Sequence, residues 1–424
     1  MGDRLRFFIN RIRERLWVKP LVFSVLSAVI VFLIKMVDAA AIGQLVPAIT
    51  EQSIKTLLTI ITGSMLMIAT FAVGSMVSAY ASASNNATPR SFALIVADDD
   101  SQNALSTFIG AFIYSVVALL AMENGYYGEA GRFALFVLTL LVLTMVIVTF
   151  VRWVDRIARL GRLKGTIEKV EKAAAAAIQR RRCAPTLGGM PAQREAEPAG
   201  QAVYSDAIGY VQQIDVAALQ RCAEKLKVHI TLSALPGTFA APGRALAFIS
   251  SDAHDVLPVD TEQMRAAFLI GDDRKFEEDP RFGLVVLAEI AGRALSPAVN
   301  DPGTAIYIVG VFVRLLAQWS KPVAESDSDA CEYDRIAVPE LSSEDMFDDA
   351  FTAIARDGAG AIEVAGRLQK GLASLASIEN EAMRAAALHH SQMALARAEN
   401  ALQLPEDLQI VRDLAGLCSN CKAE

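Results

Sequence analysis

Polar residues collect around a short turn between two apolar segments in the second half of the chain. The turn runs from Ser296 to Pro302 and joins residues 282–295 to residues 303–319, both of which have the composition of buried helices. Burying polar groups in such surroundings costs free energy unless they are paired. The cluster is therefore a candidate ligand or assembly site, and its members are Arg274, Glu278, Asp279, Ser296, Asn300, Asp301 and Thr304.

Two interpretations of this cluster stay open. In the structural one, Asn300 or Asp301 caps the helix that begins near Gly303, while Arg274 and Asp279 form a supporting salt bridge. In the functional one, the same groups bind a ligand or contact another subunit. We favour the structural interpretation and keep the functional one as the alternative.

A second pattern lies in an apolar segment near the start of the chain. Small and hydroxyl-bearing residues recur there along one face of the expected helix, and small residues at this spacing let two helices pack closely. The same face could line a polar path if several copies surrounded an axis, but packing is the favoured interpretation. The members are Thr59, Gly63, Thr70, Gly74, Ser78 and Ser82.

Strong catalytic and cofactor motifs are missing from the sequence. Cys418 and Cys421 form a Cys-x-x-Cys pair, but a zinc site needs four ligands and no second pair exists. No phosphate-binding loop, nucleophile elbow or dinucleotide fingerprint is present. We therefore expect no catalytic residues, no cofactor and no metal, and an enzyme is the third choice behind two non-enzymatic functions.

The elements that must position these residues begin with four apolar stretches, at about residues 20–37, 54–80, 104–122 and 133–151. A hydrocarbon core about 30 Å thick needs roughly 17 to 25 residues of helix. Each stretch meets this length. The pattern predicts four transmembrane helices, because lipid accepts only segments that satisfy their own backbone hydrogen bonds.

The distribution of charge predicts the orientation of these spans. Residues 1–199 hold 21 Lys and Arg against 14 Asp and Glu, whereas residues 200–424 hold 19 against 33. The basic residues lie before the first span and after the fourth, and basic flanks of this kind stay in the cytoplasm. Both termini are therefore expected in the cytoplasm, where the five cysteines would stay reduced.

Composition divides the chain into five parts. Residues 1–19 alternate apolar residues and arginines and predict an interfacial helix on anionic lipid headgroups, with an ordinary positive-inside flank as the alternative. Residues 20–155 form the four-helix transmembrane domain, and residues 156–201 form a basic helix and a linker. A small α+β cytoplasmic domain covers residues 202–270, and a helical cytoplasmic domain covers residues 271–424.

The expected fold class is thus a membrane α-helical protein with a cytoplasmic α+β domain and a helical C-terminal part. Residues 228–252 contain two short strands with Gly237 and Gly243 between them, and they resemble half of a lipoyl-type hybrid barrel. The Met-Lys hairpin that would carry a covalent cofactor is missing. The segment at residues 303–319 contains Arg314 and is expected to be a buried core helix, with a fifth span as the minority view.

Several segments resemble a bacterial family of predicted inner-membrane proteins, the domain of unknown function 2254. The resemblance covers nearly the whole chain and implies four spans, a cytoplasmic domain and a location in the bacterial inner membrane; it supplies no catalytic residues. One departure is the acidic run Val96–Asp100, where the family usually has a more basic loop. The segments that carry the resemblance are Thr88–Arg90, Phe108–Tyr114, Ser205–Asp215, Gly237–Phe239 with Gly243, Asp279–Gly283, and Ala294–Ala305.

Two functions from different classes follow as hypotheses. The leading one is an oligomeric channel or transporter-like protein for ions or small solutes, gated or assembled by its cytoplasmic domain. A chain with four spans would form a conduit most easily on a symmetry axis between copies. The alternative is a membrane-anchored sensor or scaffold that binds a ligand or partner through its cytoplasmic domain. Neither hypothesis involves nucleic acid.

Overall fold

The computed structural model describes residues 18–38, 47, 49–86, 88–92, 94, 99–159, 162–192, 200–251, 259–323 and 331–420. The chain divides into two compact units, one up to Thr166 and one from Ile167 onward. The interfacial helix expected at residues 1–19 lies almost entirely outside the described residues.

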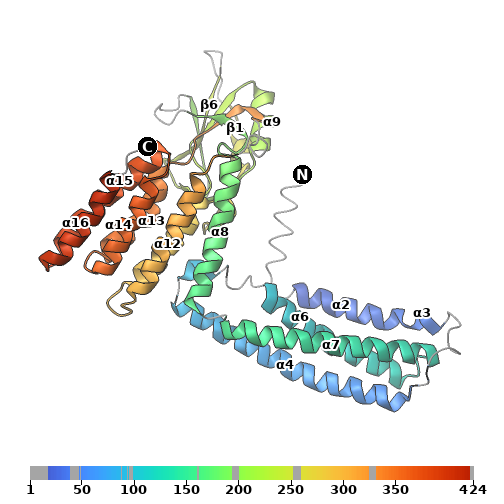
Figure 1. The fold of residues 1–424 in the computed structure, drawn as a ribbon. Helices are drawn as coiled ribbons and strands as arrows, with labels where there is room; N and C mark the ends of the chain where they lie inside the picture. Colours follow the sequence, from blue (N-terminus) through green and yellow to red (C-terminus); the bar gives the residue numbers. More distant parts are fainter. Residues whose placement is uncertain are drawn as a thin grey trace. The chain divides into compact units, whose positions relative to one another are not determined.

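Four long helices lie side by side in the first unit (Figure 1). They are α2 (Val18–Leu33), α4 (Glu51–Asn86), α6 (Asp99–Glu123) and α7 (Glu129–Arg159), with the short helices α3 (Lys35–Asp38) and η1 (Pro89–Ser91) between them. Helix α6 packs against α2, α4 and α7 and is the most enclosed of the four. A Cβ atom on Gly110 of α6 would lie 3.3 Å from the Cβ atom of Phe23, so glycine permits the close approach of α2.

Ion pairs and tyrosine hydrogen bonds join the helices of this bundle. Lys55 of α4 lies 2.7 Å from Glu51 and 3.2 Å from Glu123 of α6, and Arg132 of α7 lies 3.7 Å from Glu51. Inside the bundle, the hydroxyl groups of Tyr114 and Thr139 are 2.8 Å apart. These contacts set the register of α4, α6 and α7.

The described helices that are long and apolar enough to cross a membrane are α4, α6, α7 and α12 (Pro302–Trp319). The first three match three of the expected spans. The first expected span corresponds to α2, which has 16 residues and is followed after Ile34 by α3. Helix α12 packs instead among the helices of the second unit, where Arg314 lies 2.7 Å from Glu171.

Two β-sheets form the first part of the second unit. The five-stranded sheet has the order β1 (Gly189–Pro191), β8 (Tyr333–Val338), β4 (His229–Leu232), β6 (Ala245–Ser250) and β2 (Gln201–Tyr204), and β1, β8 and β4 run parallel. The antiparallel three-stranded sheet has the order β5 (Phe239–Ala240), β3 (Gly209–Ile214) and β7 (Phe268–Gly271). Helices α9 (Val216–Leu226) and α10 (Glu262–Arg265) complete this part.

The two strands expected within residues 228–252 are β4 and β6, and they pair antiparallel. They belong to the five-stranded sheet, whereas β5 between them belongs to the other sheet. The likeness to a lipoyl-type barrel is not confirmed by this topology and stays a prediction. The sheets share one core, which includes Val203, Leu219, Ile230, Leu246 and Ile336.

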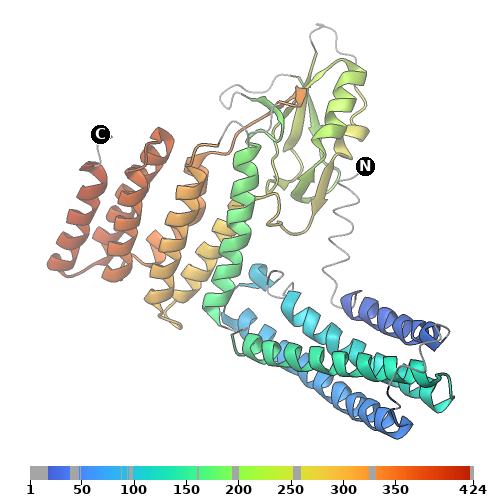
Figure 2. The ribbon, with the colours of Figure 1, turned by 45° about the vertical axis from the view of Figure 1, so that its right-hand side comes forward.

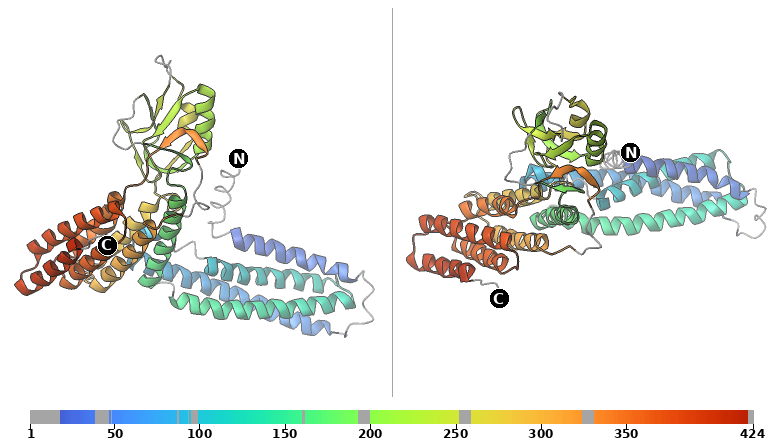
Figure 3. Two further views of the ribbon diagram at one scale, coloured as in Figure 1. Left: turned by 45° about the horizontal axis from the view of Figure 1, so that its top comes forward. Right: turned by 90° about the horizontal axis from the view of Figure 1, so that it is seen from above.

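Helical hairpins form the rest of the second unit (Figure 2). Helices α11 (Pro280–Ala294), α13 (Ser343–Asp357) and α15 (Glu381–Ala401) pack in one row, and α12, α14 (Ile362–Ala376) and α16 (Pro405–Asn420) pack in a second. Each hairpin thus stacks on the next, as in helical repeat proteins. Helix α8 (Leu163–Cys183) runs along the first hairpin, and the sheets lie beyond one end of α8 (Figure 3).

Helices α8 and α11 touch at a glycine. A Cβ atom on Gly283 of α11 would lie 2.4 Å from the Cβ atom of Ala174 of α8. Gly310 of α12 lacks this restriction, because the nearest described neighbour that its Cβ atom would meet is Nη1 of Arg314, at 3.8 Å.

We therefore predict opposite effects for two Gly-to-Ala substitutions. Gly283→Ala should destabilise the protein by about 1–3 kcal/mol because the methyl group forces α8 and α11 apart. Gly310→Ala should be neutral or stabilise by up to about 1 kcal/mol, because alanine is the better helix former. Thermal melting of the detergent-solubilised protein, followed by circular dichroism, measures both. Equal melting temperatures would contradict the close packing of α8 on α11.

His390 of α15 is buried between aromatic side chains of α13. Its ring centroid lies 5.8 Å from that of Phe347 and 6.2 Å from that of Phe351. Burial lowers the pKa of His390. The nearby charge of Asp348 raises this pKa, whereas His389 and Arg397 lower it further. The folded protein therefore holds this imidazole neutral at a pH where the unfolded chain would protonate it.

This pKa difference predicts acid sensitivity. The stabilising contribution is complete above the unfolded pKa of about 6.5 and is lost as the pH falls toward the lower folded value. His390→Leu should reduce the drop in melting temperature between about pH 7.5 and pH 5.5, because it removes the group that takes up the proton. His229→Leu, which removes a histidine of β4 that is not among the groups acting on His390, is the control. An unchanged drop in the His390 variant would rule out this residue as its source.

Candidate functional site

The six small and hydroxyl-bearing residues of α4, here called the α4 stripe, are all exposed in the single chain. The buried face of α4 is a different row of larger side chains. Neither Gly63 nor Gly74 has any described atom within 4 Å of its Cβ position. The stripe side of α4 is therefore open at both glycines. The buried row consists of Ile54, Leu58, Ile61, Met65, Ala69, Ala72, Met76 and Tyr80.

The threonine hydroxyls of the α4 stripe already have hydrogen-bond acceptors. Thr59 donates to the carbonyl of Lys55 and Thr70 donates to the carbonyl of Leu66, each at a distance of 2.8 Å. Such bonds make a hydroxyl tolerable on a membrane helix, while its oxygen lone pairs still face outward. The face is thus compatible with lipid, with another helix or with a polar path.

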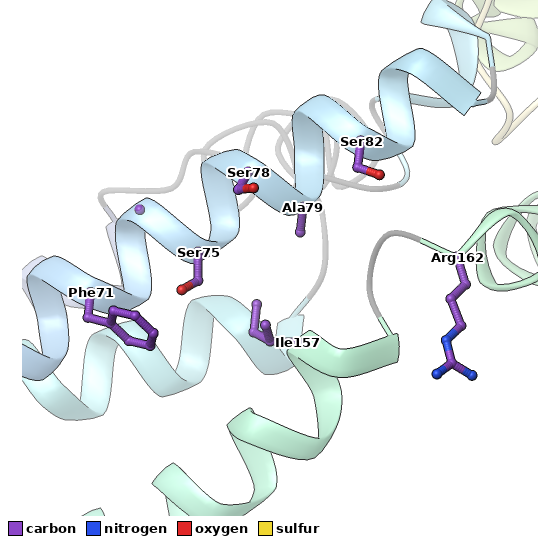
Figure 4. A pocket seen from close by; sticks show the side chains of 8 residues that line it. Phe71, Ser75, Ser78, Ala79, Ser82, Ile157 and Arg162 are labelled. Atoms are coloured by element: carbon purple, nitrogen blue, oxygen red, sulfur yellow. The ribbon is translucent and has the colours of Figure 1, made fainter.

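One end of the α4 stripe opens into a groove between α4 and the end of α7 (Figure 4). Ser75, Ser78 and Ser82 line it from α4, Ile157 lines it from α7, and Arg162 follows α7. The groove has a volume of about 570 Å³. Three hydroxyl groups and a guanidinium group are thus the polar groups of a groove whose other lining residues, such as Phe71 and Ile157, are apolar.

The polar cluster predicted from the sequence is divided between the two ends of α11. Arg274, Glu278 and Asp279 precede the helix, whereas Ser296, Asn300, Asp301 and Thr304 follow it. A helix of 15 residues is about 22 Å long. The structure therefore does not bring the seven residues together into one group.

Asp279 is the best-connected residue at the first end. It is 3 % exposed, and its carboxylate accepts hydrogen bonds from Nε and Nη2 of Arg274 at 2.7 and 3.0 Å and from the Phe282 amide at 3.2 Å. The carboxylate also fits against Gly237, where φ is +93° and a Cβ atom would lie 2.2 Å from Oδ2 of Asp279. Asp279 thus caps α11 and joins it to the turn that follows β4.

Asp301 caps α12 at the other end. Its carboxylate accepts hydrogen bonds from the Thr304 amide at 3.1 Å and from the Thr304 hydroxyl at 2.6 Å. Asn300 has a positive φ of 47°, and the hydroxyl of Ser296 donates to the carbonyl of Arg293. These contacts correspond to the structural interpretation of the turn.

A further arginine near Asp279 was not predicted from the sequence. Arg181 of α8 is 3 % exposed, and neither Nη1 nor Nη2 finds a hydrogen-bond partner among the described residues. Burial lowers the pKa of Arg181, opposed by the charges of Glu278 and Asp279. Burial also raises the pKa of Glu278, opposed by Arg180 and Arg181. Arg181 sits within a run of three arginines that resembles an ordinary membrane flank, so the sequence carried no signal for its burial.

A polar cavity of about 420 Å³ lies where the sheets meet the hairpins of the second unit. Residues that directly follow β1, β4 and β8 line it, namely Ala192, Ser233 and Pro339–Leu341. Arg274, Arg281 and the turn 235–238 complete most of its wall. We call it the strand-end cavity. The sequence reading did not predict it, because its walls come from segments far apart in the chain.

The described residues contain no group of three or more His, Cys, Asp or Glu side chains that could hold a metal ion. Cys418 is buried within α16, and Cys421 lies outside the described part of the chain. The expectations of no catalytic residue and no cofactor remain predictions.

The two capping aspartates predict a graded loss of stability. Asp301→Ala should cost about 1 kcal/mol, the usual cost of losing a helix cap. Asp279→Ala should cost more, about 3 kcal/mol, because it removes the cap of α11 and leaves the partly buried guanidinium of Arg274 without its partner. Thermal melting measures both, and Asp301→Asn, which retains a capping oxygen, is the control. Unchanged melting of Asp301→Ala together with altered assembly would favour a site at the turn instead.

Comparison with known proteins places the chain in a family. The family model described as "Predicted membrane protein (DUF2254)" matches residues 13–374. Uncharacterized protein Rv1290c of Mycobacterium tuberculosis and Uncharacterized protein Mb1321c of Mycobacterium bovis are each 35 % identical over 104 residues, which is 24 % of this chain and 20 % of theirs. The chain thus matches about a fifth of the length of these relatives, and no solved structure matches it. The chain belongs to the DUF2254 family of predicted membrane proteins.

Proposed function

We propose that this protein is an oligomeric bacterial inner-membrane channel or transporter-like protein in which α4 helices of several copies line a path for ions or small solutes. The observation that carries the proposal is the exposure of the whole α4 stripe on a membrane helix. A face of glycine, serine and threonine has little to gain from lipid contact, whereas it suits close helix packing or a hydrated path between copies.

The packing of the bundle supports a path between copies over a path through one copy. Helix α6 contacts α2, α4 and α7, and its inward side chains, such as Phe108, Tyr114 and Ala118, are buried. The exposed hydroxyl groups lie on the outside of this packed bundle. An axis shared by several copies would bring the stripes together.

The groove at the end of the stripe extends this proposal. It would form an entrance that carries three serine hydroxyls next to Arg162, at the end of the bundle where basic residues predict the cytoplasmic side. In this orientation both termini lie in the cytoplasm, and the basic flanks contact anionic headgroups.

Flux measurements test the conduit. The protein is reconstituted into liposomes loaded with an ion-sensitive dye, and Thr70→Leu and Gly74→Leu are compared with the wild type. Both should abolish flux, because a leucine on the stripe fills the path between copies. Val73→Leu, at an exposed position of α4 outside the stripe, is the matched control and should conduct as the wild type does.

Two outcomes would contradict the conduit. One is a protein that is monomeric both in mild detergent and in native nanodiscs. The other is flux that is the same in the stripe variants as in the control, with all variants folded.

A second candidate is a membrane-anchored sensor or scaffold, and the strand-end cavity favours it. A polar cavity formed by several elements of the second unit is a place where a ligand could act on the stacked hairpins. A folded protein that conducts nothing but binds a ligand at this cavity would support the sensor over the conduit.

A further inference from the structure

We propose that the strand-end cavity binds a small molecule through a carboxylate or phosphate group, held by Arg274 and Arg281. This inference deepens the second candidate above by naming the chemistry of its ligand. It stands whether or not the membrane unit conducts ions.

The position of the cavity is the first argument. Parallel strands β1, β8 and β4 are neighbours in one sheet, and the chain leaves all three at the same edge. Ala192, Ser233 and Pro339 are the first residues after these strands, and all three line the cavity. Ligands of open sheets with parallel strands bind in the crevice at the carboxyl ends of those strands. The cavity occupies that place.

The unused donors of the two arginines are the second argument. Within the described part of the chain, Arg274 uses Nε and Nη2 to bind Asp279, and Arg281 uses Nε to bind Asp349 and Nη1 to bind Asp345. Nη1 of Arg274 and Nη2 of Arg281 are therefore available to a ligand. Both guanidinium groups are held in place by their carboxylate partners, and that of Arg274 also lies 5.2 Å from the ring centre of Phe282. Donors fixed in this way lose little entropy when they bind an anion.

Two helix N-termini add to the preference for an anion. Helix α11 begins at Pro280, next to Arg281, and α13 begins at Ser343, after the loop 339–341 that lines the cavity. The partial positive charge of a helix N-terminus stabilises a nearby anion. The carboxylates of the region oppose this effect. Asp279 is bound to Arg274, whereas Asp345 and Asp349 share Arg281, and burial raises the pKa of Asp349. Glu340, the remaining acidic lining residue, is exposed to solvent.

The size of the cavity limits the ligand. A volume of about 420 Å³ is at the lower end of the range for small-molecule sites. The hydroxyl group of Ser233 and the Pro236–Gly237 turn lie along the same wall and could contact the uncharged part of the ligand. We therefore expect a free metabolite-sized anion and not a polymer.

Calorimetric titration of the full-length protein in detergent tests this inference. The probes are inorganic phosphate and succinate, with sodium chloride at matched ionic strength as the control. At least one of the two probes should bind to the wild type with a defined stoichiometry. If neither probe released or absorbed more heat than sodium chloride, the proposal would be overturned. The probe that binds more tightly would show whether the site prefers phosphate or carboxylate.

Cavity-filling variants locate the binding. Ser233→Phe fills the cavity from the end of β4 without removing a hydrogen bond of its side chain among the described residues, and Leu341→Trp fills it from the loop after β8. Each should weaken binding by about tenfold or more. Ser374→Phe, at an exposed position of α14, is the matched control and should bind as the wild type does. Wild-type affinity in a folded Ser233→Phe and a folded Leu341→Trp would place the site elsewhere and overturn the proposal.

Discussion

The buried carboxylate of Asp279 is the interaction on which the second unit depends. It caps α11, binds the guanidinium of Arg274 and fits against the turn at Gly237, so it joins the sheets to the helical hairpins. A buried carboxylate is stable only when it is paired and hydrogen-bonded, and here three donors and a glycine meet these requirements. The two arginines of the strand-end cavity take their positions from this carboxylate and from the neighbouring α13 aspartates.

Local patterns predicted the helices and caps well. The apolar runs that became α4, α6 and α7 were evident from their length, and a short polar residue before an apolar helix indicated the cap that Asp301 forms. For Asp279 the sequence predicted the ion pair with Arg274 but not its second role as the cap of α11. The grouping of the seven polar residues was not predictable in this way. The seven residues are close together in the sequence, but three precede α11 and four follow it. The rigid helix holds these two groups about 22 Å apart.

The strand-end cavity and the burial of Arg181 show the limit of such reasoning. Both depend on which distant segments meet, and short strands such as β1 carry too few residues to reveal their partners. The α4 stripe is the opposite case. Its residues were evident from the sequence, but only the packed bundle shows that the stripe faces outward while a row of larger side chains fills the interior.

The place of β8 in the sheet has a consequence for how the protein is made. Strand β8 lies between β1 and β4, although about 140 residues separate it from β1 along the chain and about 100 separate it from β4. During synthesis, β1 and β4 emerge before the strand that lies between them. They cannot pair with β8 until α11 and α12 have also been synthesised. The five-stranded sheet is therefore a late product of folding, and nascent chains shorter than residue 338 expose the unpaired edges of β1 and β4 to chaperones or to aggregation.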